Sequence, residues 1–393
     1  MEQALQGVKV LDLSRVLAGP FAGQILGDLG AEVIKVEVPD SGDTTRGWGP
    51  PYIGGESAYY LCANRNKRSV TLDFRKGRDI LERLVKWADV VLLNLRVDSL
   101  ERQKLTYDDL KAINPTIIYG LITGFGTSGP YAHKSGFDVV AQGMGGIMSI
   151  TGEPDGEPMK VGVAIVDVTS ALYLIIGILA ALRHREQTGE GQMIDVALLD
   201  SQVSWLVNVA SSYLVTGKRP NRYGNEHATI VPYQVFQVQD VYIIVAAGSE
   251  KQWKDFCDLL GRPEWKEDDQ YRTNKDRVHN RTELIAKIQE ILLTKTSEEW
   301  LHAMEQADIP GGPINPLDKV FENPQILHRE MLVKLPHPTA GEVKMVGNPI
   351  KMSATPVEYR QAPPLLGQHT EEILQELGYT LEDIQALKAN QIV

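Results

Sequence analysis

Short apolar runs alternate with stretches of helical periodicity over the first 122 residues. Runs rich in β-branched residues predict strands at 8–13, 32–37, 69–74, 89–93 and 116–122. Helices are predicted from Pro20, which suits a first helical position, to Gly30, which suits a left-handed cap, and at 77–88 and 107–113. Strand, helix and strand in succession form a βαβ unit, which requires a parallel sheet with right-handed crossovers. The pattern therefore predicts a doubly wound, Rossmann-like α/β sheet.

The pattern changes beyond residue 217. The apolar run 168–182 predicts a helix buried on all sides, a second helix at 199–215 ends at Gly217, and residues 218–226 form a polar linker. Two strands around Gln239 and Asp240 then predict a hairpin, and helical patterns follow at 249–260, 281–293 and 297–307. Because 393 residues exceed what one core usually serves, we expect a large domain over 1–217, a smaller α+β domain over 226–325 and a further segment over 326–393.

Composition excludes several classes of protein. The net charge is −11 and no basic block is present, which disfavours a nucleic-acid partner. The two cysteines lie far apart, at Cys62 and Cys257, which is typical of a reducing compartment. The apolar run 168–182 is shorter than a membrane span, and no targeting segment is recognised, so we expect a cytoplasmic protein without a membrane partner.

Asp167 stands at the start of the apolar helix. An acid there accepts hydrogen bonds from unpaired backbone N–H groups and lies at the positive end of the helix dipole. Burial favours the protonated acid while the helix terminus favours the anion, so the balance predicts an ionised, poorly hydrated carboxylate, as a nucleophile requires. The alternative is that Asp167 serves only as a helix cap.

Cations cluster between residues 65 and 102. They are Arg65, Lys67, Arg68, Arg75, Lys76, Arg78, Arg96 and Arg102. Cations at the ends of parallel strands suit a phosphate-rich ligand, and the alternative is a solvated basic face.

Other motifs are less specific. The first turn, from Arg15 to Pro20, lacks the glycine fingerprint of dinucleotide-binding proteins but offers small residues for the approach of a ligand. The glycine-rich residues 124–130 precede Asp138 and either shape a pocket or form a surface loop. The eight histidines show no metal-ligand spacing, so no metal site is expected, and the candidate catalytic groups are the carboxylates of Asp167 and Asp138.

Six segments in order resemble those of the family III CoA-transferases over essentially the whole chain. They are Asp12-Leu13-Ser14-Arg15-Val16-Leu17-Ala18-Gly19-Pro20, Gly30-Ala31-Glu32-Val33-Ile34-Lys35-Val36-Glu37, Asn66-Lys67-Arg68-Ser69, Gly136-Phe137-Asp138, Gly162-Val163-Ala164-Ile165-Val166-Asp167 and Leu365-Leu366-Gly367-Gln368-His369-Thr370. The resemblance implies that Asp167 attacks an acyl-CoA thioester and passes through an aspartyl anhydride and an aspartyl-CoA thioester, in a site that excludes water. The residues that match the family's CoA-binding positions are Val16, Ala18, Leu72, Arg75, Asn94 and Arg102.

Within that family, residues 230–234, 277–281 and 312–315 resemble the succinyl-CoA–glutarate (hydroxymethylglutarate) CoA-transferases. This implies succinyl-CoA as donor and a dicarboxylate such as glutarate as acceptor, with Arg46, His227 and Tyr233 as candidate ligands of the distal carboxylate. The alternative is an α-methylacyl-CoA racemase on the same fold. Racemases of this type pair a histidine with an aspartate, and Phe137, whose ring cannot carry a proton, occupies the histidine position.

The family's architecture implies that residues 326–393 return to complete the large domain, with the small domain inserted between its halves. It also implies an interlocked homodimer. Coenzyme A is expected as a co-substrate, beside a small carboxylic acid, with no tightly bound cofactor.

Overall fold

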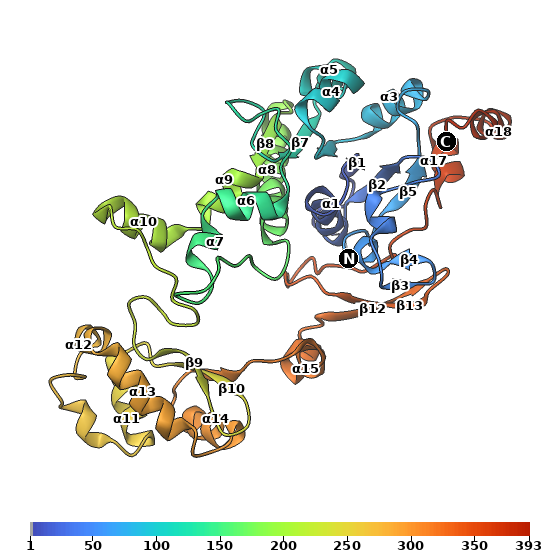
Figure 1. Ribbon diagram of the computed structural model, residues 1–393. Helices are drawn as coiled ribbons and strands as arrows, with labels where there is room; N and C mark the ends of the chain where they lie inside the picture. The colour runs from blue at the N-terminus through green and yellow to red at the C-terminus, as the bar shows by residue number, and fades with distance from the viewer. Residues whose placement is uncertain (1–2) are drawn as a thin grey trace. The chain divides into compact units, whose positions relative to one another are not determined.

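The computed structural model describes residues 3–393, which divide into two compact units (Figure 1). The first unit contains the stretch up to Ile147 together with Lys160–Ser211 and Pro324–Val393. The second unit contains Met148–Met159 and Ser212–Asn323. It thus includes residues 148–159, which the sequence pattern placed with the large domain. Each unit is described separately below.

A six-stranded sheet forms the centre of the first unit. Its strands are β1 (Lys9–Asp12), β2 (Glu32–Glu37), β5 (Arg68–Thr71), β6 (Val90–Leu93), β7 (Ile118–Thr123) and β8 (Met193–Ala197). They lie in the order β5-β2-β1-β6-β7-β8, and each neighbouring pair is parallel. This is the doubly wound order, in which the chain direction across the sheet reverses between β1 and β6. The predicted parallel α/β sheet is confirmed.

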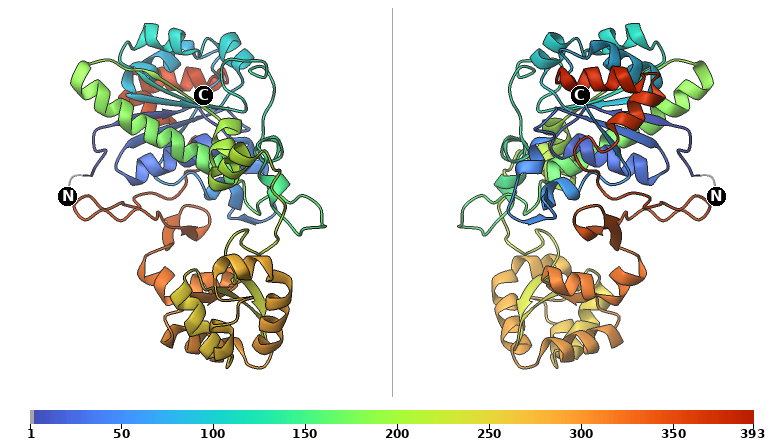
Figure 2. Two further views of the ribbon diagram at one scale, coloured as in Figure 1. Left: turned by 90° about the vertical axis from the view of Figure 1, so that its left-hand side faces the viewer. Right: turned by 90° about the vertical axis from the view of Figure 1, so that its right-hand side faces the viewer.

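Alternate residues of the strands pack against helices on opposite faces of this sheet. Val10 and Leu92 join the core formed with α1 (Ala18–Asp28) and α8 (Ile165–Thr188). Leu11 and Leu93 join the core on the other face, formed with α3 (Arg78–Trp87), α5 (Tyr107–Ile113), α17 (Thr370–Glu376) and α18 (Leu381–Ala389). Figure 2 shows the red C-terminal helices beside the teal helices of residues 78–113. The C-terminal segment therefore completes one layer of the first unit.

Shorter elements surround this sheet. They are the 3-10 helix η1 (Thr44–Gly47), β3 (Tyr52–Ile53), β4 (Glu56–Ser57), α2 (Ala58–Leu61), α4 (Val97–Gln103), α6 (Asp138–Met144), α9 (Leu198–Ser204), α16 (Pro324–His328) and the hairpin of β12 (Leu332–His337) and β13 (Gly341–Val346). Two more helices, α7 (Ile147–Ile150) and α10 (Val207–Thr216), cross from one unit to the other. The single helix predicted at 199–215 is wrong, because the backbone at Val207 has a φ of 26° and separates α9 from α10.

The second unit is an α+β structure. Its three-stranded antiparallel sheet has the order β11-β10-β9 and contains the predicted hairpin, formed by β9 (Tyr233–Gln237) and β10 (Tyr242–Ala246), with β11 (Gly311–Pro313) at the edge. The helices are α11 (Glu250–Leu259), η2 (Pro263–Lys266), α12 (Asn274–His279), α13 (Arg281–Leu292), α14 (Ser297–Gln306) and α15 (Leu317–Glu322). Buried aromatic side chains, among them Trp253, Phe256 and Trp300, fill its core.

Helix α8 differs from the expected all-round buried helix. Leu174 and Ile178 are buried against the sheet, whereas Leu172 and Ile176 are exposed, the latter at 62%. The helix is also longer than the predicted 168–182, and within residues 3–393 it alone is long and apolar enough to cross a membrane by those two criteria. The expectation that it is too short is wrong, since Ile165–Thr188 spans 24 residues. Half of its most apolar window is buried in the core of the first unit.

Candidate active site

The first turn of α8 is capped by a side chain from another helix. Asp138, the first residue of α6, accepts the backbone N–H of Val166 at 2.7 Å and that of Asp167 at 3.2 Å through Oδ2. The residue at the N-cap of α8, Ala164, has no side chain able to do so. The alternative that Asp167 serves as the helix cap is therefore wrong, because Asp138 performs that role and leaves the Asp167 carboxylate available for other chemistry.

Asp138 is itself held in place. The side-chain amide of buried Gln142 donates to Oδ1 of Asp138, and its carbonyl oxygen accepts the N–H of Val161 at 2.8 Å. The segment before Asp138 can reach this position because Gly136 passes very close to Gly124. A Cβ on Gly136 would lie 2.4 Å from the Gly124 Cα, so neither residue tolerates a side chain without a backbone shift. The glycine-rich connection is thus part of the site's framework.

Asp167 lies in an environment that opposes its ionisation. Burial, followed by the nearby charge of Asp138, raises the pKa of Asp167 to about 7. Within residues 3–393 its carboxylate makes no hydrogen bond or ion pair with another side chain. Burial and the charge of Asp138 thus favour the protonated acid, in contrast to the expected ionised carboxylate.

A cavity of about 210 Å³ opens beside Asp167. Its other lining residues are Val16, Leu17, Ala18, Asn94, Arg96, Ile122, Thr123, Gly124, Ser135, Gly136, Phe137 and Leu198. Three predicted CoA-binding residues, Val16, Ala18 and Asn94, are therefore brought together with the predicted nucleophile. The site lies at the carboxyl ends of β1 and β6, where the doubly wound sheet reverses, which is the usual position of ligand sites in such sheets.

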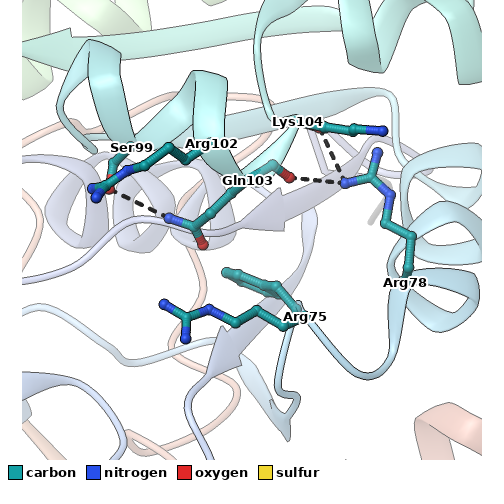
Figure 3. A pocket seen from close by; sticks show the side chains of 7 residues that line it. Arg75, Arg78, Ser99, Arg102, Gln103 and Lys104 are labelled. Atoms are coloured by element: carbon teal, nitrogen blue, oxygen red, sulfur yellow. Dashed lines mark hydrogen bonds between the residues drawn. The ribbon is translucent and has the colours of Figure 1, made fainter.

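A second cavity, of about 430 Å³, is lined by four cations (Figure 3). They are Arg75, Arg78, Arg102 and Lys104, accompanied by Phe74, Ser99 and Gln103. Arg78 donates to the carbonyl oxygens of Gln103 and Lys104, whereas the Arg75 side chain lies exposed in the cavity. Such a concentration of positive charge in an acidic protein suits a phosphate-bearing ligand.

A third cavity, of about 310 Å³, adjoins the cationic one. Its lining includes Leu72, Arg75 and Arg15, and it shares Phe74, Arg75 and Gln103 with the cationic cavity. Arg15 is the chain neighbour of Val16, which lines the cavity of Asp167. The six predicted CoA-binding residues thus line three cavities rather than one pocket. The cationic cavity and the third cavity share residues, whereas the cavity of Asp167 shares none with either.

Other cations of the cluster serve the fold. Arg65 pairs with Asp28 at 2.6 Å, and Lys67 pairs with Asp12 at 2.8 Å, with all four side chains buried. Arg68 binds three glutamates on the surface of the sheet. The sequence predicted either a phosphate site or a solvated basic face for these three cations. Both predictions are wrong for them, because each cation forms ion pairs with acidic side chains of the protein.

The candidate ligands of a distal carboxylate have other partners. Arg46 is held by Glu37 and Glu56, each at 2.8 Å, so it is not free to bind a substrate. His227 and Tyr233 pack against each other in the second unit with their rings tilted by 56° and ring centroids 5.2 Å apart. Arg46 thus has protein partners, and the choice among the three candidates stays a prediction.

Tyr59 is a residue that the sequence analysis missed and whose ionisation is coupled to the candidate site. Burial, followed by the charges of Asp167, Cys62 and Asp138, raises the pKa of Tyr59 to about 12. Its ring packs edge-on against Trp48, with centroids 5.1 Å apart. No sequence motif marked this tyrosine, because it comes from the short helix α2, far from Asp167 in sequence.

Among residues 3–393, no group of three or more histidine, cysteine or acidic side chains is arranged to hold a metal ion.

Comparison with known proteins finds relatives with similar sequences and structures. The model of the family described as CoA-transferase family III matches residues 5–370. The chain is 44% identical to the succinyl-CoA:glutarate CoA-transferase of Homo sapiens, over 95% of this chain and 86% of that protein. It is also 44% identical to the succinate–glutarate CoA-transferase of Agrobacterium fabrum, over 95% of both chains. A crystal structure of a CAIB/BAIF family protein from Brucella suis superposes with a TM-score of 0.87 at 44% identity, covering 96% of this chain and all of that one.

Proposed function

The chain belongs to CoA-transferase family III and is an enzyme that transfers coenzyme A, and on this premise we propose that it carries CoA from succinyl-CoA to a dicarboxylate such as glutarate. The observation that carries the proposal is Asp167, a poorly solvated carboxylate without protein partners in the described chain, which shares a cavity with Val16, Ala18 and Asn94. Support for the two substrates comes from the names of the relatives that are 44% identical.

The first half of the reaction loads the enzyme. In our proposal an oxygen of ionised Asp167 attacks the thioester carbon of succinyl-CoA, the C–S bond breaks, and CoA leaves as a thiolate with the electron pair. The thiolate then attacks the Asp167 carbonyl carbon of the resulting anhydride. Succinate departs, and an aspartyl-CoA thioester remains.

The second half repeats these steps in reverse order. The acceptor carboxylate attacks the aspartyl thioester and displaces CoA thiolate, which gives a second mixed anhydride. Attack of the thiolate on the acceptor's acyl carbon forms the new acyl-CoA and returns Asp167 as a carboxylate. Since each intermediate is an activated acyl group, burial of Asp167 protects it from hydrolysis. Asp138 orients the helix turn that carries Asp167.

The three cavities would hold different parts of the CoA molecule in this proposal. Arg75 and Arg102 would bind phosphates, and the thioester end would reach Asp167. The resemblance implies that Val16 and Leu72 flank the adenine, whereas here they line different cavities and Val16 lines the one beside Asp167. Coenzyme A is then a co-substrate, with no tightly bound cofactor, and the cytoplasm is the proposed location.

Covalent loading is the direct test. Intact-mass measurement after incubation with succinyl-CoA should show an adduct on the wild type that hydroxylamine converts to a hydroxamate at Asp167. Asp167→Ala should show neither the adduct nor exchange of labelled succinate into succinyl-CoA, while Asp200→Asn, on the exposed side of α9, retains both. Exchange by Asp167→Ala at the wild-type rate would refute the assignment. A panel of C2 to C6 dicarboxylates tests the acceptor, and glutarate ranking below monocarboxylates would reject it.

We also propose an interlocked homodimer. Support comes from apolar side chains exposed on α6, α8 and α9 of the first unit, among them Val139, Met144, Ile176 and Val203, each at least 49% exposed. Light scattering should give twice the chain mass for the wild type. Ile176→Glu should weaken the dimer, whereas a monomeric wild type at micromolar concentration would disprove it.

A further inference from the structure

Three of the six family-like segments contribute charged residues that are buried and do not line the cavity of Asp167. Asp12, Lys35 and Lys67 each have 0% exposure, and they come from three different segments. Lys67 Nζ binds Asp12 at 2.8 Å, and Lys35 Nζ binds Asp43 at 3.0 Å. Burial opposes the charge of Lys35, but Asp12 and Asp43 together hold its pKa above the usual value. The result is a buried ion cluster whose members the mechanism does not use.

Lys35 and Asp43 of this cluster also bind the backbone of the turn that contains Ser14 and Val16. Lys35 Nζ donates to the carbonyl oxygen of Ser14 at 3.0 Å, and both oxygens of Asp43 accept the N–H of Val16, at 3.2 and 3.3 Å. Between them, Asn94 binds both the N–H and the carbonyl oxygen of Arg15. The two consecutive peptide groups between Ser14 and Val16 are therefore held by side chains rather than by secondary structure.

The turn needs such support because of one residue. Val16 has a φ of 69°, in the left-handed region that β-branched side chains strongly disfavour. A residue in that region persists only when its surroundings determine its conformation. Directly after it, Leu17 and Ala18 line the cavity with Asp167, and α1 begins at Ala18. The conformation of Val16 therefore sets the position of that cavity wall.

We propose that Lys35 and Asp43 are positioning residues of the transferase, which hold Ser14 and Val16 so that the left-handed turn shapes the acyl-CoA cavity beside Asp167. The inference rests on the proposed function of that cavity. The carboxylate of Asp43 is itself held in place by Thr45, because its Oδ1 also accepts the N–H and the hydroxyl of Thr45, at 3.0 and 2.8 Å. The same carboxylate thus joins the 3-10 helix η1, the buried Lys35 and the turn.

The competing explanation is that the cluster only stabilises the fold. Glycine at position 16 distinguishes the two, because glycine adopts a positive φ without strain and its turn needs less external support. Asp43→Asn should lower kcat/KM for acyl-CoA by about tenfold, mainly through KM, because the neutral amide loses Lys35 and keeps one acceptor oxygen. Val16→Gly alone should cost some activity, since it removes a side chain that lines the cavity. Added to Asp43→Asn, it should raise kcat/KM by about threefold or more over the single variant.

Glu330→Gly is the matched control. Glu330 also has a positive φ, of 53°, but lies exposed at the end of the turn before β12. It should add stability without restoring activity to Asp43→Asn. Equal or lower activity of the Asp43→Asn/Val16→Gly double variant would overturn the proposal and leave the cluster a purely stabilising role.

Two further measurements keep the test decisive. If Asp43→Asn does not fold, Thr45→Val replaces it, since it removes one hydrogen bond that fixes Asp43 and should give a smaller loss that Val16→Gly also restores. Covalent loading of Asp167 is measured on the wild type in parallel. Loading without the rescue rejects only the positioning role, whereas a wild type that never loads rejects the proposed function itself.

Discussion

Asp138 Oδ2 lies 3.2 Å from the backbone nitrogen of Asp167, so one acid caps the end of α8 and leaves the other facing the cavity. The two carboxylates thus have separate tasks. Asp138 satisfies the helix terminus, and its charge makes Asp167 harder to ionise. This arrangement predicts that the reactivity of Asp167 depends on pH in the neutral range.

The first prediction concerns the pH profile. Because Asp167 must be ionised to attack and its pKa is about 7, kcat/KM for CoA exchange should rise with pH with a midpoint near 7. Asp138→Asn removes the neighbouring charge and should move that midpoint down by about 1 pH unit. Asp200→Asn, on exposed α9, should leave it unchanged. An Asp138→Asn profile that coincides with that of the wild type would contradict the electrostatic link.

The free energy of unfolding should change with pH in the opposite direction to activity, and fall as pH rises. The folded pKa of Asp167 is raised from 3.8 to about 7, so its contribution to stability is complete below about pH 4 and is lost as pH rises to about 7. Asp167→Asn should therefore raise the free energy of unfolding by on the order of 2 kcal/mol at pH 8, after allowing for solvent screening, and by little at pH 4. Urea unfolding at both pH values measures the difference. Asp155→Asn, in an exposed loop, should show no such gain.

Removal of a cation from the cationic cavity should weaken the binding of the nucleotide end of CoA. Arg75→Ala and Arg102→Ala should each raise KM for succinyl-CoA by about tenfold with little change in kcat, because a charge-assisted contact to phosphate is lost. Succinyl-pantetheine, which lacks the nucleotide, should not distinguish the variants from the wild type. Lys76→Ala, next in sequence but outside the cavity lining, is the control. An unchanged KM for succinyl-CoA would remove Arg75 from the binding site.

Lys67 is expected to matter for folding rather than for substrate binding. Lys67→Met leaves the Asp12 carboxylate buried without its partner and should lower the free energy of unfolding by about 3–5 kcal/mol. Arg183→Met breaks an exposed pair with Glu186 and should leave the denaturation midpoint almost unchanged. Equal midpoints for the two variants would show that the buried pair is not needed for stability.

Local patterns predicted much of the large unit. Strand β2 and helix α5 lie at the expected residues, since apolar periodicity there agrees with the packing. Strand β8 was missed, because the exposed Asp195 in its middle interrupts the apolar pattern. The face of α8 that carries Ile176 was expected to be buried, because composition alone does not show which side of an apolar helix meets the sheet.

The candidate site was predicted as a set of residues but not as a geometry. The start of the apolar helix singled out Asp167, the resemblance added the CoA-binding residues, and Asp138 was singled out without its role as a cap. That role depends on α6 reaching α8, a contact between segments that no local pattern records. For the same reason the acids that neutralise Arg65 and Lys67 could not be chosen from the sequence.

The first unit cannot complete its fold until the ribosome has made the C-terminal segment. His369 Nδ1 accepts the N–H of Ser69, and Ile373 and Leu374 close the apolar face of a sheet whose edge strand was made 300 residues earlier. A nascent chain must keep that face uncovered while the ribosome makes the whole second unit. We therefore expect the unfinished protein to depend on chaperones, and a stop codon shortly before His369 to yield an aggregating chain rather than a smaller enzyme.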